Sequence, residues 1–222
     1  MTEKDDFQTL YHKPDVQRYR QYVLADQQAE LWDKYAALNQ QVSHPNMVFA
    51  GDSITEYFPL HEMLSASVPL YNRGVHGITS LQLLEHLDSQ VLDLKPSRVF
   101  ILIGVNDLKT REPKAVCQTI QDIIGQIRQQ LPETDIVLLS LFPMDESPEF
   151  VRTPSQRNNQ TIAQLNSLLS KLANDKVHWL DIHDLLCDNQ GQLKREWTVD
   201  GLHLTVASYS IVAKALADYL IL

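Results

Sequence analysis

The sequence alternates five short apolar runs with longer segments of helical periodicity, and this alternation restricts the fold more than any other feature. The runs lack the alternating polar residues of a half-exposed strand, which is typical of a parallel sheet covered by helices on both faces. Strand–helix alternation of this kind predicts one doubly wound α/β domain. The predicted strands are 47–50, 68–71, 98–103, 135–140 and 176–181, and the predicted helices lie near 79–94, 114–131, 155–174 and 205–221.

An additional helix is predicted before the first strand, over about 15–42. Leu31, Tyr35, Leu38 and Val42 recur at helical spacing with polar residues between them, as in a helix that packs one face on a core. The His44-Pro45-Asn46 segment ends it, because proline and the residue before it disfavour helix. We expect residues 1–45 to form a helical extension packed on the α/β domain at 46–222, and we leave open a homo-oligomer contact through this helix.

Charge and apolar content exclude some classes of partner. A formal net charge of −9 over 222 residues repels phosphate backbones, so we expect no nucleic-acid partner. No stretch approaches the roughly 18 apolar residues of a membrane span, and the polar N-terminal residues lack the apolar segment of a signal peptide. We therefore expect a cytoplasmic protein. Cys117 and Cys187 lack CxxC spacing and are predicted to be buried thiols rather than metal ligands.

Polar or glycine-rich residues follow the predicted strands at the points where they end. Ligands of open α/β sheets bind outside the carboxyl ends of the strands, so these stretches are expected to meet at one edge. They read GDS at 51–53, NRGVHG at 72–77, GVND at 104–107 and, before the last helix, DGLH at 200–203.

Ser53, His203 and Asp200 have the side chains that nucleophilic catalysis needs. A serine attacks a carbonyl when a histidine takes its proton, and a carboxylate orients that histidine and stabilises its charged form. Each residue also has an ordinary interpretation when taken alone. Asp52 or Ser53 could simply cap the helix that follows, and a short D-x-x-H pattern recurs by chance.

An acyl-transfer site also needs hydrogen-bond donors where the oxyanion develops. The backbone N–H of Ser53, the backbone N–H of Gly77 and the side-chain amide of Asn106 are the candidates. Alternatively, Gly77 could serve a turn with positive φ, and Asn106 a local bond from side chain to backbone.

Taken together, "GDSITEYF", "NRGVHGITS", "GVND" and "DGLHLT" resemble the conserved-block order of the SGNH subgroup of the GDSL hydrolases, over residues 47 to about 210. The resemblance implies a flavodoxin-like three-layer α/β/α sandwich with a five-stranded parallel sheet. It also implies hydrolysis of esters and some thioesters without a metal or organic cofactor. The "NRGVHGITS" segment is similar to that of platelet-activating-factor acetylhydrolase-like members.

The resemblance implies a role for each matching position. Ser53 would be the nucleophile and first oxyanion donor, Gly77 and Asn106 the other two donors. His203 would be the general base and Asp200 its partner. The first block reads GDSI rather than GDSL, a conservative change that should leave the chemistry intact.

The substrate is expected to be a small ester with a short acyl group. Ile78 and His76 stand where those relatives often have Asp and Gly, which leaves the pocket undefined. Asp52, His76 and Phe142 are candidates for substrate contact, and the long connection 142–156 could form a wall or lid of the site. An O-acetylated sugar and an acetylated phospholipid analogue both stay open.

Two other classes of function were weighed. A metallophosphoesterase needs about seven ligands around two metal ions, and the first strand lacks an Asp-x-His pair while GVND lacks a following His. A non-catalytic binding domain could retain the fold, but the complete set of nucleophile, base, acid and oxyanion donors argues against it. We therefore favour an esterase.

Overall fold

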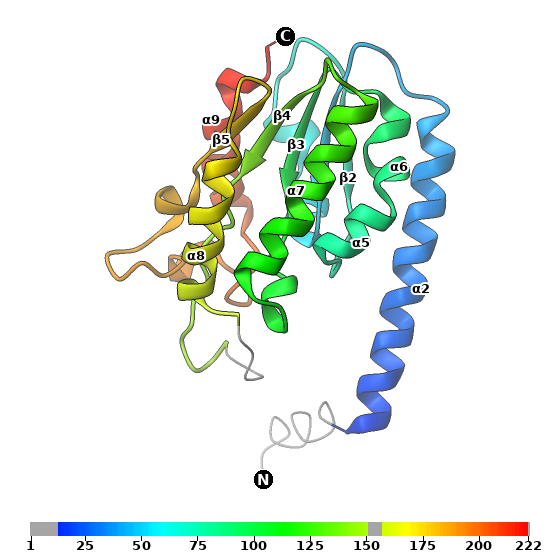
Figure 1. The fold of residues 1–222 in the computed structure, drawn as a ribbon. Helices are drawn as coiled ribbons and strands as arrows, with labels where there is room; N and C mark the ends of the chain where they lie inside the picture. Colours follow the sequence, from blue (N-terminus) through cyan, green and yellow to red (C-terminus); the bar gives the residue numbers. More distant parts are fainter. Residues whose placement is uncertain (1–12, 151–156, 222) are drawn as a thin grey trace.

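The computed structural model describes residues 13–150 and 157–221, and it consists of a parallel sheet between two layers of helices (Figure 1). The five strands are all parallel, in the order β2-β1-β3-β4-β5. This confirms the predicted α/β sandwich with a five-stranded sheet. The strands are β1 Met47–Gly51, β2 Leu70–Gly74, β3 Arg98–Leu102, β4 Asp135–Leu139 and β5 Val177–Leu180.

The helices that follow β2, β3 and β4 pack side by side on one face of the sheet (Figure 1). The face of α7 that points to the sheet carries Val116, Ile120, Ile123 and Ile127, all fully buried, at the spacing that the sequence predicted. The helices with eight or more residues in this layer are α7 Pro113–Gln130 and α8 Asn159–Leu169; the shorter ones are α5 Ser80–Glu85 and α6 Leu87–Gln90.

The opposite face of the sheet is covered by α9 (Val206–Leu216), with the short helix α3 (Ser53–Glu56) against β1 and β2 and the short helix α4 (Leu60–Met63) against β2. Phe49 and Phe100 are paired in register on neighbouring strands, and their rings stack with centroids 4.3 Å apart. All five residues of β1 are buried, which explains why its sequence shows no polar alternation.

Two predicted elements differ from the structure. The helix predicted over 79–94 is divided into α5, α6 and a 3-10 turn, because His86 leaves helical geometry and stacks on Trp32, with ring centroids 3.5 Å apart. The second strand begins and ends later than predicted. It includes Asn72, whose Nδ2 donates to the Thr55 carbonyl at 2.8 Å, so a polar side chain joins this edge strand to α3.

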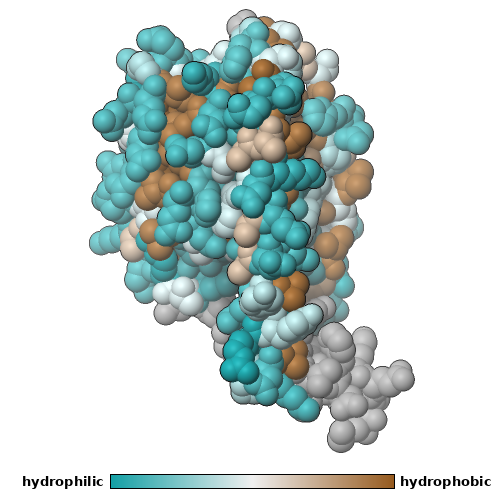
Figure 2. All heavy atoms as spheres, turned by 90° about the vertical axis from the view of Figure 1, so that its right-hand side faces the viewer, coloured by the Kyte–Doolittle hydropathy of each residue, from teal (hydrophilic) through white to brown (hydrophobic). Residues whose placement is uncertain are grey.

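Helix α2 (Pro14–Asn39) lies beside α6 next to the β2 edge, and its N-terminal half extends past the rest of the molecule (Figures 1 and 2). The expected apolar stripe is only partly correct. Tyr35 is buried, but Leu38 is 44% exposed, and the other buried positions are Gln28 and Asn39. Leu31 and Val42 of the expected stripe are partly buried and pack against the core, so the contact face of α2 combines apolar and polar side chains. Residues 1–12 of the predicted extension lie outside the described residues, and its division from the rest at residue 45 stays a prediction.

None of the described helices is both long enough and apolar enough to cross a lipid bilayer.

Candidate active site

The chain passes from β1 to β2 at the sheet edge and then returns to β3 on the other side of β1. This reversal makes the carboxyl ends of β1 and β3 the topological switch point of the sheet, the place where ligands of open α/β sheets bind. Ser53 follows β1 and Asn106 follows β3. The topology therefore brings together two of the predicted site residues.

Ser53 is the first residue of α3, directly after the cap residue Asp52. The Oδ1 atom of Asp52 accepts a hydrogen bond from the Ile54 N–H at 3.0 Å, so Asp52 caps the helix as one interpretation of the sequence expected. A Cβ added to Gly51 would lie 2.1 Å from the Leu102 carbonyl oxygen. Glycine is thus required at the end of β1, because the backbone just before Ser53 runs directly beside β3.

Ser53, His203 and Asp200 form one continuous chain of hydrogen bonds. The Oγ of Ser53 lies 2.8 Å from Nε2 of His203, and Nδ1 of His203 lies 2.6 Å from Oδ2 of Asp200. Ser53 and His203 are 150 positions apart in sequence, so only the fold brings them together. This is the arrangement of a nucleophile, a base and an orienting acid.

The loop that carries Asp200 and His203 is held by its own hydrogen bonds. Oδ1 of Asp200 accepts from the N–H groups of Leu202 at 3.1 Å and His203 at 2.8 Å. Burial alone would favour the protonated carboxyl, but the bonds from the His203 side chain and backbone outweigh it and lower the pKa of Asp200 to about 2. Asp200 is therefore ionised near neutral pH, as a partner of a positively charged imidazole should be.

The loop also packs against the connection after β4. The Asp145 N–H donates to the Gly201 carbonyl at 2.9 Å, and a Cβ on Gly201, whose φ is +90°, would lie 2.7 Å from the Phe150 side chain. Residues 142–150, the first part of the predicted wall or lid, therefore pack against the loop that carries the candidate base, His203. Residues 151–156 of that connection lie outside the described residues.

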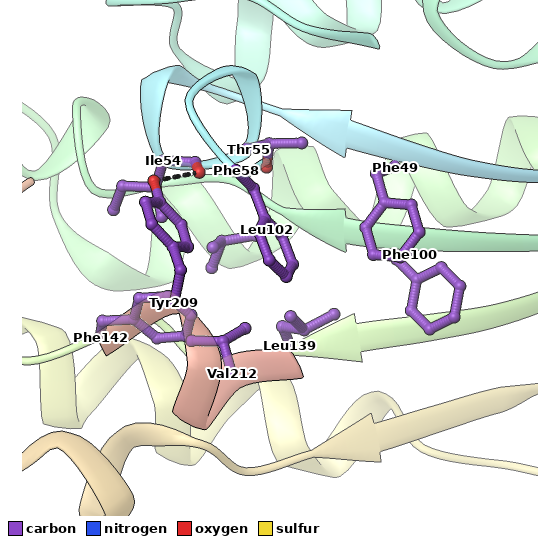
Figure 3. A pocket seen from close by; sticks show the side chains of 10 residues that line it. All are labelled: Phe49, Ile54, Thr55, Phe58, Phe100, Leu102, Leu139, Phe142, Tyr209 and Val212. Atoms are coloured by element: carbon purple, nitrogen blue, oxygen red, sulfur yellow. Dashed lines mark hydrogen bonds between the residues drawn. The ribbon is translucent and has the colours of Figure 1, made fainter. Parts of the chain in front are cut away.

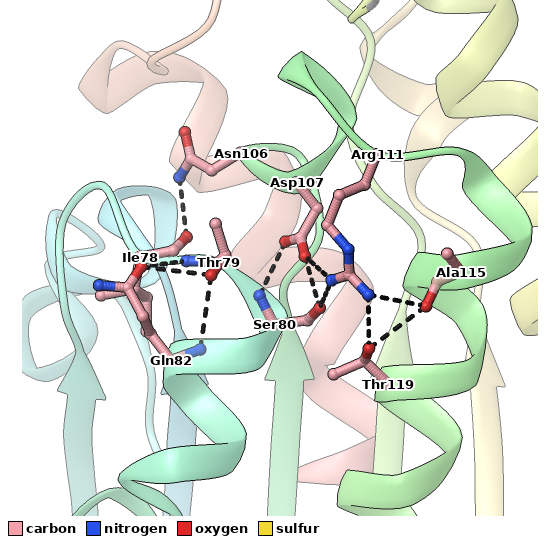
Figure 4. A network of polar contacts seen from close by, with 9 residues as sticks. All are labelled: Ile78, Thr79, Ser80, Gln82, Asn106, Asp107, Arg111, Ala115 and Thr119. Atoms are coloured by element: carbon pink, nitrogen blue, oxygen red, sulfur yellow. Dashed lines mark hydrogen bonds and ion pairs between the residues drawn. The ribbon is translucent and has the colours of Figure 1, made fainter.

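The loops after β2 and β3 are joined by buried polar contacts (Figure 4). Nδ2 of Asn106 donates to the Ile78 carbonyl at 3.1 Å, which uses one of its two N–H groups. The carboxylate of Asp107, fully buried, accepts from the backbone N–H of Ser80 at 2.7 Å and the Ser80 hydroxyl at 2.6 Å. Arg111 neutralises the same carboxylate at 2.6 Å. Asp107 thus orients the loop.

The three expected substrate contacts have different positions. Asp52 and Phe142 are 1% and 2% exposed, so both lie in the interior, and their contact with substrate stays a prediction. Burial raises the pKa of Asp52 to about 6, against the lowering effects of the Ile54 N–H and of His203. His76 is partly exposed, and its Nδ1 lies 2.9 Å from Oε2 of Glu56, so its ring is held at the loop rather than free in solvent.

An apolar cavity of about 20 Å³ lies beneath α3, between the sheet and α9 (Figure 3). Phe142, Phe58 and Val212 are among its walls, and the Tyr209 hydroxyl closes one side by donating to the Ile54 carbonyl at 2.7 Å. This volume is about that of one water molecule. It is therefore a packing gap, and Phe142 belongs to the core rather than to an acyl pocket.

Arg73 and Arg157 occupy positions that no local sequence pattern signals. Arg73 is 4% exposed and its Nε donates to Oδ1 of Asn39 at 2.9 Å, so it does not pair at the surface. Arg157, which no motif indicated, has buried Nε and Nη1 atoms that find no hydrogen-bond partner among residues 13–150 and 157–221. Burial lowers its pKa, while Asp52 and Asp200 oppose that effect. Both positions depend on distant elements, so no local pattern signals them.

The predicted cysteines are only partly buried, and burial raises the pKa of each thiol. Cys187 lies after β5 with its Sγ 3.6 Å from Nδ1 of His183, whose ring also contacts Asp184 at 2.9 Å. This group belongs to the chain between β5 and the last helix and includes none of the candidate catalytic residues.

Comparisons with known proteins agree with the geometry. Platelet-activating factor acetylhydrolase IB subunit alpha2 of Rattus norvegicus is 29% identical over 178 residues, which are 78% of this chain and 75% of the relative. A protein of Streptococcus pneumonia described as a platelet activating factor has a TM-score of 0.88 and 35% identity, over 94% of this chain and 99% of its own.

A mutant of the acetyl-xylooligosaccharide esterase Axe2 from Geobacillus Stearmophilus shares the fold, with a TM-score of 0.59 and 18% identity over 78% of this chain and 93% of its own. The sequence profile of the GDSL-like Lipase/Acylhydrolase family matches residues 49–211, most of the chain and all of the candidate site. The protein therefore belongs to the GDSL-like lipase/acylhydrolase family and is a carboxylic ester hydrolase.

Proposed function

We propose that the protein hydrolyses small esters with short acyl groups through an acyl-enzyme on Ser53. The observation that carries the proposal is the unbroken hydrogen-bond chain from Ser53 through His203 to Asp200, at the carboxyl edge of β1. Two similar proteins support a short acyl group. The relative is an acetylhydrolase, and one protein of the same fold is an acetyl-xylooligosaccharide esterase.

In the first half-reaction, Ser53 Oγ attacks the ester carbonyl carbon while His203 Nε2 takes the hydroxyl proton. The carbonyl oxygen becomes an oxyanion, for which the Ser53 N–H, the Gly77 N–H and the second N–H of the Asn106 amide are the proposed donors. The bond to the alcohol oxygen then breaks, and His203 gives its proton to that oxygen. Asp200, ionised as its low pKa requires, stabilises the protonated imidazole throughout.

In the second half-reaction, a water molecule takes the place of the alcohol. It loses a proton to His203 and attacks the acyl carbon, and the collapse of the second oxyanion returns the proton to Ser53 Oγ and releases the acid. Every proton that moves passes through Nε2 of His203, the atom that faces Ser53. The mechanism uses only groups of the chain and water.

The first test compares p-nitrophenyl acetate, butyrate and octanoate as substrates of the wild type and of Ser53→Ala, with and without EDTA. The expected result is chelator-resistant activity, highest on acetate or butyrate, that falls by about 10⁴–10⁶ in Ser53→Ala. Ser210→Ala, on the exposed side of α9, serves as the matched control and should keep wild-type activity.

Mass spectrometry after treatment with a fluorophosphonate gives an independent readout, because the adduct should form on Ser53 in the wild type alone. Equal activity in the wild type and Ser53→Ala, or activity that EDTA abolishes, would contradict the proposal. Acetylated xylose oligosaccharides and a short-chain acetylated phospholipid analogue are then compared, to decide which alcohol the site accepts.

A further inference from the structure

Helix α2 contacts the segment around β2 and α6 through hydrogen bonds as well as apolar packing. Four of its side chains do so at helical spacing. Tyr35 donates to the Gly74 carbonyl at 2.6 Å, Asn39 to the Ser89 carbonyl at 2.8 Å, and Trp32 to Oε1 of Gln90 at 3.0 Å. The fourth, Gln28, reaches the loop that carries Gly77.

Gln28 is held on both sides of its amide. Its Nε2 donates to the His76 carbonyl at 2.8 Å, and its Oε1 accepts from Nε2 of Gln82 at 3.2 Å. Gln82 in turn accepts from the Thr79 N–H at 3.1 Å within the capping box of α5. Gln28 is only 4% exposed, so its amide orientation is determined by these partners rather than by solvent.

The His76 carbonyl and the Gly77 N–H belong to the same peptide group. A trans peptide is planar, and its C=O and N–H point in opposite directions. When Gln28 holds the His76 oxygen toward α2, the Gly77 N–H must therefore point away from α2. The approach is close, since a Cβ at Gly77 would lie 3.3 Å from Nε2 of Gln28 and 3.3 Å from the Leu24 methyl groups.

Because residue 77 is a glycine, the orientation of the peptide group between His76 and Gly77 has to be maintained by a neighbouring residue. The φ of Gly77 is +75°, and glycine populates positive and negative φ about equally. The peptide between His76 and Gly77 can consequently rotate to its opposite orientation without a Cβ clash at Gly77. In that orientation the N–H would point toward α2 and would not be available to an oxyanion.

We propose that Gln28 is a positioning residue for ester hydrolysis, because its hydrogen bond to the His76 carbonyl keeps the Gly77 N–H directed at the oxyanion. This inference rests on the proposed function, in which Gly77 is an oxyanion donor. It makes α2 a working part of the active site, although none of its residues belongs to the family's sequence blocks.

The test uses Gln28→Met, which keeps the length of the side chain and removes the donor. Loss of one oxyanion donor lowers kcat by about 10²–10³, and misdirection of that donor for part of the time should lower kcat by roughly 10–100-fold. The KM for p-nitrophenyl acetate should change by less than about twofold, since the donor acts mainly on the transition state. Gln27→Met, the same change at the exposed neighbouring position, should leave kcat and KM unchanged.

A second variant, Gln28→Glu, distinguishes positioning from packing. An ionised carboxylate cannot donate to the His76 carbonyl, whereas the protonated form can. The ratio of its kcat to that of the wild type should therefore rise as the pH falls from 8 to 5. Thermal unfolding of each variant is measured in parallel, so that kinetic constants are compared only between folded proteins.

The outcomes separate this inference from the proposed function. If Ser53→Ala is inactive while Gln28→Met keeps kcat within about twofold of the wild type, the positioning role is wrong and the serine mechanism stands. A kcat ratio for Gln28→Glu that does not change with pH would likewise assign Gln28 a purely structural role. Full activity of Ser53→Ala would instead overturn the proposed function, and with it the premise of this inference.

Discussion

Ser53 owes its position to the small residues around it. Gly51 lets the chain pass within contact of the Leu102 carbonyl, and Gly74 lets β2 pass α3, since a Cβ there would lie 2.2 Å from the Glu56 nitrogen. Asp52, which follows Gly51, caps α3 with one carboxylate oxygen, and its other oxygen is buried without a partner in the part of the chain that the structure describes. Ser53 can thus lie at the carboxyl edge of the sheet because Gly51 and Gly74 have no side chain and the side chain of Asp52 points inward.

The inward-facing carboxyl of Asp52 predicts a pH-dependent stability. Its pKa in the folded protein, about 6, lies above the ordinary value of 3.8, so the folded state favours the protonated form. The contribution of Asp52 to stability is therefore complete below about pH 4 and is lost as the pH rises through 6, at a cost of up to about 3 kcal/mol.

Asp52→Asn keeps an oxygen for the Ile54 N–H and removes the ionisation. The variant should gain stability relative to the wild type as the pH increases, and the gain at pH 8 should exceed that at pH 4.5. Urea unfolding of both proteins at the two pH values measures this difference. An equal difference at both pH values would show that Asp52 does not titrate in this window.

At the scale of elements, the contact of β2 with α3 is as important as the hydrogen bonds of the sheet. Asn72 and Gly74 on the strand meet Thr55 and Glu56 on the helix, so the edge strand positions the helix that carries Ser53. The prediction from apolar runs placed this strand at 68–71 rather than at Leu70–Gly74, because the residues that join the strand to α3 are polar or small.

Two glycine substitutions should have opposite effects for this reason. Gly74→Ala places a Cβ against the backbone of α3 and should destabilise the protein by about 1–3 kcal/mol, with a lower kcat. Gly125→Ala, in the middle of α7 with no atom within 4 Å of the new Cβ, should stabilise it by about 0.5–1 kcal/mol. Denaturant unfolding of both variants checks the signs, and a neutral Gly74→Ala would refute the close-packing argument.

At the scale of the whole molecule, the core is continuous from the sheet to both helical layers, with the small cavity beneath α3 as a local gap. Val212→Ile adds one methylene at its wall and should raise the stability by up to about 1 kcal/mol. Val206→Ile, at a position that is 71% exposed, is the matched control and should have little effect. A lower melting temperature for Val212→Ile alone would mean that the gap cannot accept the methylene.

Several expectations about the whole molecule stay predictions. They are the cytoplasmic location, the absence of a nucleic-acid partner, homo-oligomer formation and the division of the chain at residue 45. The first three concern the environment or the partners of the chain rather than its internal contacts. The fourth concerns how the chain is divided, which neither the fold nor the family decides.

The sequence by itself determined the sheet, its parallel strands and the residues of the candidate site. Strands covered on both faces must be apolar throughout, which leaves unbroken apolar runs in the sequence. The catalytic side chains and oxyanion donors must be particular residue types in stretches at the carboxyl edge of the sheet, and these stretches form short local motifs. Only the tertiary structure decided what Gln28 and Arg73 do. Their hydrogen-bond partners, the His76 carbonyl and the Asn39 side chain, lie on elements distant in sequence, and a buried polar side chain that bonds to a remote group has no periodicity by which a sequence could reveal it.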